Sequence, residues 1–365
     1  MKCHIKPTKI RELNKTNNLF QSGFWASFRS LQQYETIPFR FSYEEGEGQG
    51  VAVLRPIGDG YYFAYLPWAP DLYVDEEKQG QLLESLACEL TPLLSPNCLF
   101  IRFDPFWESP YEINEESESE PGDSGRPPPR IRELRMNFNT RQWNLVKAPT
   151  NVQPVDTIVL DIRKDPASLL SEMKSKTRYN IRLSERQGVT VEDASIEALP
   201  YWYELYTDTM KRKGITVTPY SYFKRLFSVE NTFTMKRPEQ APKLKLLMAK
   251  TRGEYLGGIV LIVCGNYAMY LYGASSLKRK ELMANYRLQW EAIKIAQQHS
   301  CYYYDLHGIP VNKSRSNPMF GLFQFKRGFG GRIVHRRGCW DYPVEKDLYK
   351  RVAFSETGKA GYYRR

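Results

Sequence analysis

The sequence predicts an α/β (α+β) protein built from two domains in tandem, because three observations agree. The chain has 365 residues, which suggests about two domains of ordinary size. Its 42% hydrophobic content is ample for buried cores. Strand-like and helix-like segments alternate, and both halves of the chain repeat one order: helix, strand hairpin, strand, helix, strand. No residue-level repeat accompanies this order, so an internal duplication is inferred from the elements alone.

In the first half, apolar alternation and turn residues predict a strand hairpin around Gly58-Asp59-Gly60. The elements expected here are strands at 50–56 and 61–67, a helix at 79–94, and strands at 98–104 and 142–146. Residues 108–130 interrupt this series with seven acidic residues and then a triple proline, which is typical of a flexible insertion. Because strand-like runs flank it, we expect this insertion to lie within one domain.

In the second half, the helix predicted at 198–213 ends at Gly214, a natural C-cap. The other elements expected are a strand at 157–162, a helical region at 166–186, strands at 245–250, 255–264, 267–273 and 302–306, and a helix with the apolar face Leu288, Ala292, Ile295 and Ala296. The resulting domain boundaries are 1–153 plus 332–365 for domain 1, and 154–331 for domain 2.

Charge and cysteine content limit the classes of function. A net charge of +11 favours anionic partners such as nucleic acid, sugar-nucleotide phosphates or a membrane surface, although a merely basic soluble protein fits equally. No apolar run is long enough for a transmembrane helix and no signal-peptide core is visible, so a cytoplasmic protein is expected. The six cysteines are scattered without zinc-ligand spacing, which predicts reduced thiols and no metal.

The stretch 323–331 is the most informative part of the chain. Lys326 follows Phe325 between aromatic residues and precedes three glycines, Gly328, Gly330 and Gly331. Glycines let a backbone approach a ligand closely or take positive φ values. A lysine held in such a frame is well placed to donate to a phosphate or to a developing oxyanion.

An ordered series of motifs leads up to this stretch. These motifs are Tyr270-Leu271-Tyr272-Gly273-Ala274-Ser275-Ser276, Tyr286-Arg287-Leu288-Gln289-Trp290 and Tyr304-Asp305-Leu306-His307-Gly308-Ile309. Together with 323–331, the series resembles the C-terminal half of the FemABX aminoacyltransferases, which add amino acids from charged tRNA to peptidoglycan precursors. The resemblance implies two GNAT-like domains. No long charged heptad stretch is present for a helical-hairpin arm, so the chain is similar to an arm-less, FemX-like member.

The resemblance also implies roles for individual residues. Lys326, preceded by Phe325, matches a lysine proposed to stabilise the tetrahedral intermediate or the leaving ribose. Tyr222, Tyr270 and Tyr272 match residues that line the substrate channel, and alternation along one strand places the last two on the same face. A core aromatic ladder is the other interpretation of that pair.

Two residues of domain 1 match the acceptor side of the family. Arg29 follows Gln21-Ser22-Gly23-Phe24-Trp25-Ala26, where a basic residue contacts the diphosphate of the nucleotide-sugar acceptor; a surface arginine is the alternative. Asp104 ends a strand-like run and matches a candidate catalytic base, or it caps the turn before Pro105. Some members have an arginine where this chain has Thr218, which leaves open whether a neighbouring basic residue compensates.

Basic residues supply a candidate tRNA surface. Lys174, Lys176 and Arg178 lie on a predicted helix that resembles the basic helix opening the family's second domain. Residues 301–365 carry 13 Lys or Arg against 5 Asp or Glu, including Arg336 and Arg337, which suits the phosphates of a tRNA acceptor stem. A solvated helix face explains the first group equally well.

The implied reaction transfers an aminoacyl group, with Gly, Ala or Ser common in the family, from tRNA to the side-chain amine of a diamino acid in the stem peptide. The acceptor is UDP-MurNAc-pentapeptide or lipid II, and the activated ester requires no cofactor. A monomer is expected, either free in the cytoplasm or bound peripherally at the inner face of the membrane.

Three alternatives stay open. The first is a GNAT N-acyltransferase using acyl-CoA, whose pyrophosphate signature is approached at 327–332 but ends in Arg332. The second is a non-catalytic RNA-binding protein, although no RRM or KH pattern occurs. The third is a tRNA-dependent transferase acting on a different amine, such as a lipid or a protein N-terminus.

Overall fold

The computed structural model describes residues 3–44, 46–111 and 127–357. The chain forms two compact units, the first made of Met1–Asp156, Pro310–Pro318 and Val334–Arg365 and the second of Thr157–Ile309 and Met319–Ile333. The sequence-based boundaries lie within three residues of the two main divisions. They do not anticipate that Pro310–Pro318 returns to the first unit.

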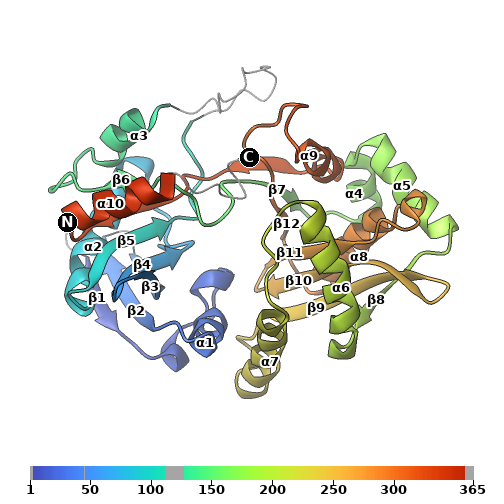
Figure 1. Ribbon diagram of the computed structural model, residues 1–365, viewed down its shortest axis with the longest axis horizontal. Helices are drawn as coiled ribbons and strands as arrows, with labels where there is room; N and C mark the ends of the chain where they lie inside the picture. Colours follow the sequence, from blue (N-terminus) through green and yellow to red (C-terminus); the bar gives the residue numbers. More distant parts are fainter. Residues whose placement is uncertain (1–2, 45, 112–126, 358–365) are drawn as a thin grey trace. The chain divides into compact units, whose positions relative to one another are not determined.

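The first unit contains a seven-stranded mixed sheet in the order β1-β2-β3-β4-β5-β14-β6 (Figure 1). All of its pairs are antiparallel except β4 with β5, which run parallel. The strands are β1 (His4–Pro7), β2 (Thr36–Tyr43), β3 (Gly46–Gly58), β4 (Tyr61–Pro67), β5 (Cys98–Asp104), β6 (Val146–Lys147) and β14 (Trp340–Pro343). The helices are α1 (Gly23–Leu31), α2 (Glu76–Leu90), α3 (Pro129–Met136) and α10 (Lys346–Thr357).

The second unit contains another seven-stranded sheet, in the order β13-β7-β12-β11-β10-β9-β8. Its one parallel pair recorded among the described residues is β11 with β12. The strands are β7 (Asp156–Asp161), β8 (Thr190–Ala194), β9 (Lys243–Thr251), β10 (Glu254–Cys264), β11 (Tyr267–Ser275), β12 (Tyr303–Gly308) and β13 (Arg332–His335). The helices are α4 (Pro166–Glu172), α5 (Ser175–Arg186), α6 (Leu199–Arg212), α7 (Tyr220–Lys236), α8 (Ala284–Gln298) and α9 (Phe320–Arg327).

The two sheets repeat one topology. In each, four consecutive antiparallel strands (β1 to β4, or β8 to β11) lead into a crossover helix (α2 or α8) and a parallel fifth strand (β5 or β12). An antiparallel strand from elsewhere in the chain then flanks that fifth strand, β14 in the first unit and β7 in the second. The duplication inferred from the order of elements is therefore confirmed.

Each crossover helix buries one apolar stripe, as its sequence period requires. On α8 the buried residues include Leu288, Ala292, Ile293 and Ala296, which pack with Ile181 of α5 on one face of the second sheet. The other face is covered by α6, which Figure 1 shows crossing β10 and β11. Because both faces are covered, nearly all of β10 is buried.

Most predicted elements are confirmed, and the departures are local. Gly214 follows α6 with φ +63°, the left-handed C-cap expected. The strand predicted at 142–146 shrinks to Val146–Lys147. The helical region at 166–186 is two helices, α4 and α5. The elements that were not predicted are β1, β2, β8, β13, β14, α3, α7, α9 and α10. Of the insertion at 108–130, residues 112–126 lie outside the described residues, and 129–130 already belong to α3.

Candidate active site

The parallel strands of the second unit diverge, and this divergence, which we call the strand split, defines the candidate site. β11 and β12 pair only from Tyr267–Tyr303 to Met269–Asp305, although both strands continue further. At the same place the pairing of β12 with β7 jumps from Asp305 to Gly308, which marks a β-bulge. Bulges are frequent beside active sites, because they re-aim groups out of the sheet ladder.

Lys326 of α9 reaches the end of β12 beyond the strand split. Its side chain is only 4% exposed, and its Nζ donates to the carbonyl oxygens of Gly308 at 2.7 Å and His307 at 3.1 Å. The ring of Tyr270 on β11 lies 5.4 Å from Nζ, within cation–π range. The lysine thus lies between the two diverging strands and bonds to carbonyls past the last β11–β12 pair.

Burial sets the electrostatics of this lysine. Desolvation lowers the pKa of Lys326 to about 7; the charge of Asp305 acts against that shift and the charge of Lys213 adds to it. Asp305 is itself fully buried and accepts hydrogen bonds from the Tyr267 hydroxyl and the His307 amide, both at 2.7 Å. An amine with a pKa near neutrality can both donate a hydrogen bond as an ammonium and exchange its proton.

Lys326 lies in α9, so the three glycines follow the helix that carries the lysine. The positive φ values belong to Gly330 and Gly331, which turn the chain from α9 into β13. A Cβ at Gly331 would lie 2.6 Å from the Val159 carbonyl oxygen, so only glycine fits there. Phe325 packs edge-on against Phe329 and Tyr286, and so supports α9 from the core.

Tyr270 and Tyr272 do not share a face, which corrects the alternation argument. Val260 pairs with Tyr272 and Leu261 pairs with Tyr270, so Leu271 is an extra residue that forms a β-bulge. Tyr270 packs with the core cluster of α5 and α8, and its hydroxyl lies where a Cβ of Gly273 would be. Tyr272 packs against the helices of the opposite face.

Tyr222 and Tyr272 do come together, on the α6–α7 face. Their hydroxyl oxygens are 2.9 Å apart, and Tyr272 lies edge-on to Phe223 with ring centroids 5.1 Å apart. Thr218 accepts a hydrogen bond from Tyr206 at 3.1 Å. Arg212, a basic residue six positions before Thr218, donates to the Ser275 carbonyl at 2.9 Å.

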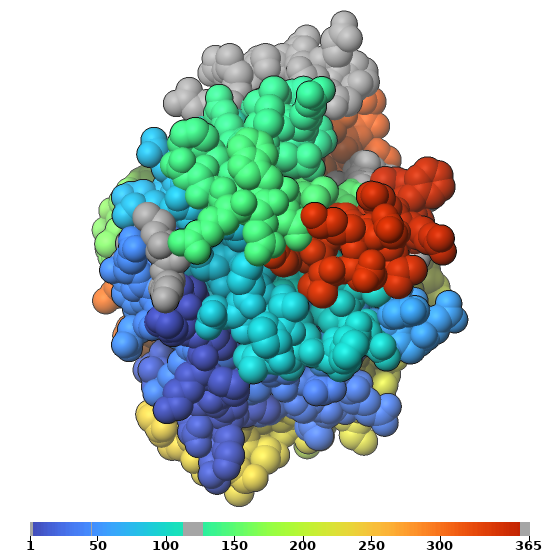
Figure 2. Space-filling view, turned by 90° about the vertical axis from the view of Figure 1, so that its left-hand side faces the viewer, coloured from blue at the N-terminus to red at the C-terminus, as the bar shows by residue number. Residues whose placement is uncertain are grey.

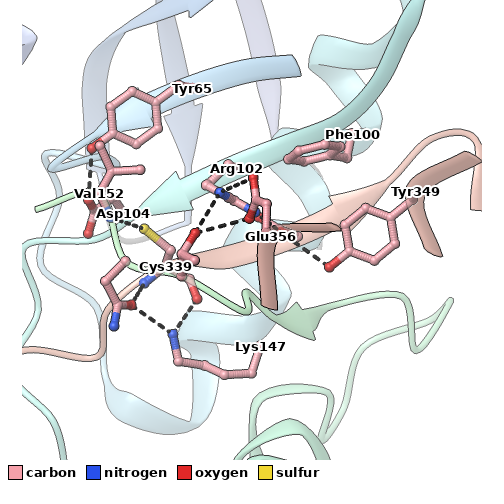
Figure 3. A network of polar contacts seen from close by, with 12 residues as sticks. Tyr65, Phe100, Arg102, Asp104, Lys147, Val152, Cys339, Tyr349 and Glu356 are labelled. Atoms are coloured by element: carbon pink, nitrogen blue, oxygen red, sulfur yellow. Dashed lines mark hydrogen bonds and ion pairs between the residues drawn. The ribbon is translucent and has the colours of Figure 1, made fainter. Parts of the chain in front are cut away.

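In the first unit, Asp104 belongs to a buried polar network around the ends of β5 and β14 (Figure 3). Its Oδ2 accepts hydrogen bonds from the Tyr65 hydroxyl at 2.8 Å and the Gln153 amide at 3.1 Å, and burial raises its pKa. Cys339 and Lys147 lie in the same network. Through these contacts Asp104 stabilises the buried network. Its catalytic role stays a prediction.

Arg29 lies near the end of α1, half-buried. Its Nη1 donates to Gln32 at 2.7 Å, and its guanidinium lies 4.3 Å from the ring centroid of Tyr34. The first turn of α1 is capped by Ser22, whose Oγ accepts from the Trp25 amide. Contact between Arg29 and a diphosphate stays a prediction.

The basic residues predicted to meet tRNA fall into two groups. Lys174 and Lys176 are exposed at the start of α5, while Arg178 donates to the Ser171 carbonyl at 3.1 Å and so fastens the end of α4. Tyr179, 57% exposed within this basic run, was not singled out, although an aromatic among cations was visible in the sequence.

Arg336 and Arg337 are buried in the first unit, at 5% and 9% exposure. The guanidinium of Arg336 lies 3.7 Å from the ring centroid of Phe106 and donates to that residue's carbonyl, and Arg337 pairs with Glu76 at 3.5 Å. Their contacts are internal, so we do not assign them to a tRNA surface. Across the described ranges, no group of three His, Cys, Asp or Glu residues is arranged to hold a metal.

A membrane-spanning helix is likewise not found: within the described residues, no helix is both long and apolar enough.

Comparison with known proteins gives one consistent result. The model of the FemAB family matches residues 11–237 and 229–357. Among curated proteins, the lipid II:glycine glycyltransferase of Staphylococcus haemolyticus (strain JCSC1435) is 24% identical over 257 residues, covering 55% of this chain and 61% of that protein. The protein of the same name from Staphylococcus aureus (strain USA300) is 25% identical over 259 residues, covering 55% and 62%. The match thus spans about three fifths of the length of these relatives.

Among solved structures, the crystal structure of FemX matches with a TM-score of 0.74 and 18% identity, covering 96% of this chain and all of FemX. A conserved protein of unknown function from Bacteroides thetaiotaomicron VPI-5482 matches with a TM-score of 0.50 and 9% identity, covering 93% and 99%. At these identities the likeness shows the fold, and it confirms the expected tandem of two GNAT-like domains.

Proposed function

Because the chain belongs to the FemAB family, we propose that it is an aminoacyltransferase that moves an amino acid from aminoacyl-tRNA to the side-chain amine of a peptidoglycan stem peptide. Relatives named as lipid II:glycine glycyltransferases favour glycine as the transferred residue, ahead of Ala or Ser, and lipid II as the acceptor, ahead of UDP-MurNAc-pentapeptide. The observation that carries the proposal is the buried Lys326 at the strand split.

For this reaction the protein must position the ester and the acceptor amine and stabilise the negative charge that develops on the carbonyl oxygen. The acceptor nitrogen attacks the ester carbonyl carbon, the carbonyl electrons move onto oxygen, and the amide forms as the ribose oxygen leaves with a proton. An ammonium at Lys326 donates to the oxyanion, where a single preorganised donor is commonly worth about 3 kcal/mol. Its pKa of about 7 also lets the same group protonate the leaving ribose oxygen.

The acceptor amine must lose a proton before it attacks, because a free lysine-type amine has a pKa of about 10.4. The Tyr222–Tyr272 hydroxyl pair supplies neutral hydrogen-bond partners on the α6–α7 face. Neutral partners orient an uncharged amine without favouring its protonated form. We assign these two tyrosines to substrate binding and Tyr270 to the surroundings of Lys326.

The tRNA contacts are assigned to α5 of the second unit. Lys174, Lys176 and Arg182 are exposed cations, and the exposed ring of Tyr179 lies between them along the helix. Cations hold phosphates, whereas an aromatic ring among them offers a surface on which an unpaired base can stack. In the first unit, Arg29 is assigned to the acceptor diphosphate and Asp104 to holding the buried network at the end of β5.

The test is direct transfer by the purified chain. The chain is incubated with tRNA charged with radiolabelled glycine, and in parallel with alanine or serine, plus detergent-solubilised lipid II or UDP-MurNAc-pentapeptide. We expect label in the precursor, with the highest yield from glycine and lipid II. Acylation from acetyl-CoA without transfer from any charged tRNA would instead support a GNAT N-acyltransferase, and tRNA binding without transfer an RNA-binding protein.

We further propose that the chain acts at the inner face of the membrane as a peripheral protein and as a monomer. The net charge of +11 supports electrostatic attraction to anionic lipid headgroups. Sedimentation of the purified chain at micromolar concentration checks the monomer, and a dimer there would contradict it.

A further inference from the structure

Helix α3 and the turn after it expose an apolar stripe that the described residues of the first unit do not bury. Ile131, Leu134 and Phe138 follow each other at helical spacing and are 41%, 46% and 57% exposed, and Trp143 nearby is 57% exposed. The described residue that α3 buries is Met136. Figure 2 shows the green segment that contains α3 standing at the surface of this face.

Arginines surround this stripe. Arg130, Arg135 and Arg141 are exposed, and Arg132 is half-buried. The one acidic residue in 127–143 is Glu133, whose carboxylate already accepts a hydrogen bond from the Lys147 amide at 2.8 Å. The segment therefore combines large apolar side chains with a net positive charge.

The stripe is presented on a rigid base. A Cβ at Gly80 of α2 would lie 1.7 Å from the Met136 carbonyl oxygen, so α2 and α3 are in close backbone contact. The turn after α3 is held by Asn137, whose side-chain amide donates to the Leu145 carbonyl at 2.7 Å and accepts from the Leu145 amide at 3.0 Å. Apolar side chains exposed from such a fixed frame indicate an external partner.

We propose that this segment is a membrane-docking surface that binds an anionic lipid bilayer. We call it the α3 surface, made of Arg130, Ile131, Leu134, Arg135, Phe138, Arg141 and Trp143. Apolar and aromatic side chains flanked by arginines are the pattern of elements that lie in the bilayer interface, with the cations among the headgroups. An RNA partner would use the arginines but leave Ile131 and Leu134 without a role. The inference rests on the proposed function only in that a lipid-linked acceptor gives such docking a purpose.

The test measures binding of the full chain to sedimented vesicles, without any transfer assay. Vesicles of phosphatidylglycerol and phosphatidylcholine are compared with phosphatidylcholine alone. We expect at least about tenfold tighter binding to the anionic vesicles, weakening as salt is raised. Equal binding to both vesicles, or none to either, would overturn the proposal.

Two variants locate the contact. Phe138→Ala with Trp143→Ala should lower vesicle binding by about tenfold or more, because both rings lose their burial in the interface. Tyr73→Ala with Phe354→Ala is the matched control: it removes two aromatic rings of the same unit that are 83% and 81% exposed, and should change binding less than about twofold. Thermal unfolding verifies that both double variants are folded. Equal losses in the two would overturn the assignment to α3.

Two further outcomes name other occupants, and each would overturn the proposal. One is a dimer of the full chain that the Phe138→Ala and Trp143→Ala pair dissociates, since the stripe would then bind a second copy. The other is vesicle binding that appears only after the acidic residues of 112–123 are changed to Gln or Asn, since that run would then occupy the α3 surface. Failure of glycyl transfer would leave all these measurements intact, so the two proposals fail separately.

Discussion

The two units differ where their parallel strands meet. In the first unit β4 and β5 stay paired from Tyr62–Cys98 to Pro67–Asp104, whereas in the second unit β11 and β12 part after Met269–Asp305. The surrounding topology is the same. One framework therefore serves either as a closed sheet, whose parallel pair reaches the ends of both strands, or as an open sheet, whose parallel pair ends early.

The buried cations of the two units reflect this difference. Arg102 on β5 is 2% exposed and makes a bidentate pair with Asp341 of β14, both contacts at 2.7 Å, and reaches Glu356 of α10 at 3.0 Å. Burial disfavours its charge, but these carboxylates outweigh that effect and raise its pKa. Lys326 bonds to carbonyl oxygens instead, and its pKa falls to about 7. A buried cation that pairs with carboxylates stabilises the sheet and stays charged. A buried lysine that bonds to carbonyl oxygens can gain and lose its proton near neutral pH.

The largest expected effect is on the closed sheet. Arg102→Met should lower the free energy of unfolding by about 3–5 kcal/mol, because Asp341 loses its partner while it stays buried. Urea unfolding followed by fluorescence measures this change. Lys350→Ala is the control, because Lys350 and Asp347 form an exposed ion pair. This variant should leave the midpoint of urea unfolding unchanged. A loss below about 1 kcal/mol for Arg102→Met would mean that the pair contributes little.

The next effect is on the open sheet. Lys326→Ala should lower kcat for glycyl transfer by about 10²–10³-fold, with KM changed little, because the lost donor acts on the transition state. Lys326→Arg should not restore the rate, since an arginine stays charged and cannot protonate a leaving group. Lys250→Ala removes a lysine of the same unit that pairs with Glu192 and serves as control. Transfer that survives in Lys326→Ala would remove this lysine from the mechanism.

A third effect is the pH dependence of stability, and its sign is set by the lowered pKa. Between about pH 7 and 10.5 the folded chain holds Lys326 neutral while the unfolded chain binds a proton there. Stability therefore rises with pH across this window, by up to about 1.4 kcal/mol per pH unit from this group. Lys326→Met should lack that contribution, so the difference in free energy of unfolding between variant and wild type should shrink as pH rises. If the free energies of unfolding of the variant and the wild type changed in parallel with pH, burial would not lower the pKa of Lys326.

The smallest effect concerns the aromatic face of the second unit. Tyr222→Phe and Tyr272→Phe each remove one hydroxyl of the 2.9 Å contact and keep the rings. We expect KM for the acceptor to rise up to about tenfold, with a coupling energy of about 1 kcal/mol in a double-mutant cycle. Tyr201→Phe, on an exposed ring of α6, is the control. Additive effects would mean that the two hydroxyls act independently.

Hydrophobic patterns within single segments predicted the helices and strands whose formation depends on their own residues. Residues 98–104 were predicted as a strand and form β5 with those bounds, because the short apolar run 98–101 with Phe103 suits a strand buried on both faces. Of the strand predicted at 142–146, only Val146 lies in β6, because the Asn144 side chain bonds to the Pro343 carbonyl and the Leu145 amide bonds to the Asn137 side chain instead of forming backbone ladder pairs. No pattern within one segment encodes such long-range partners.

For the candidate site, the sequence indicated residues but not their geometry. The sequence indicated Lys326, yet its burial depends on carbonyls of β12, eighteen and nineteen positions earlier in the chain. Tyr270 and Tyr272 ended on opposite faces because a bulge at Leu271 breaks the period of two. A bulge has no sequence signal here, since Leu271 is an ordinary strand residue.

The position of β14 has a consequence for the order in which the chain is made. Trp340–Pro343 inserts between β5 and β6, so β5 lacks its partner on that edge until more than two hundred later residues have left the ribosome. At usual rates of synthesis this interval is on the order of tens of seconds. During that time an apolar strand edge stays unpaired while most of the second unit is translated. A late-translated segment therefore completes the first unit, and nascent chains stalled before Trp340 should be the ones that chaperones retain.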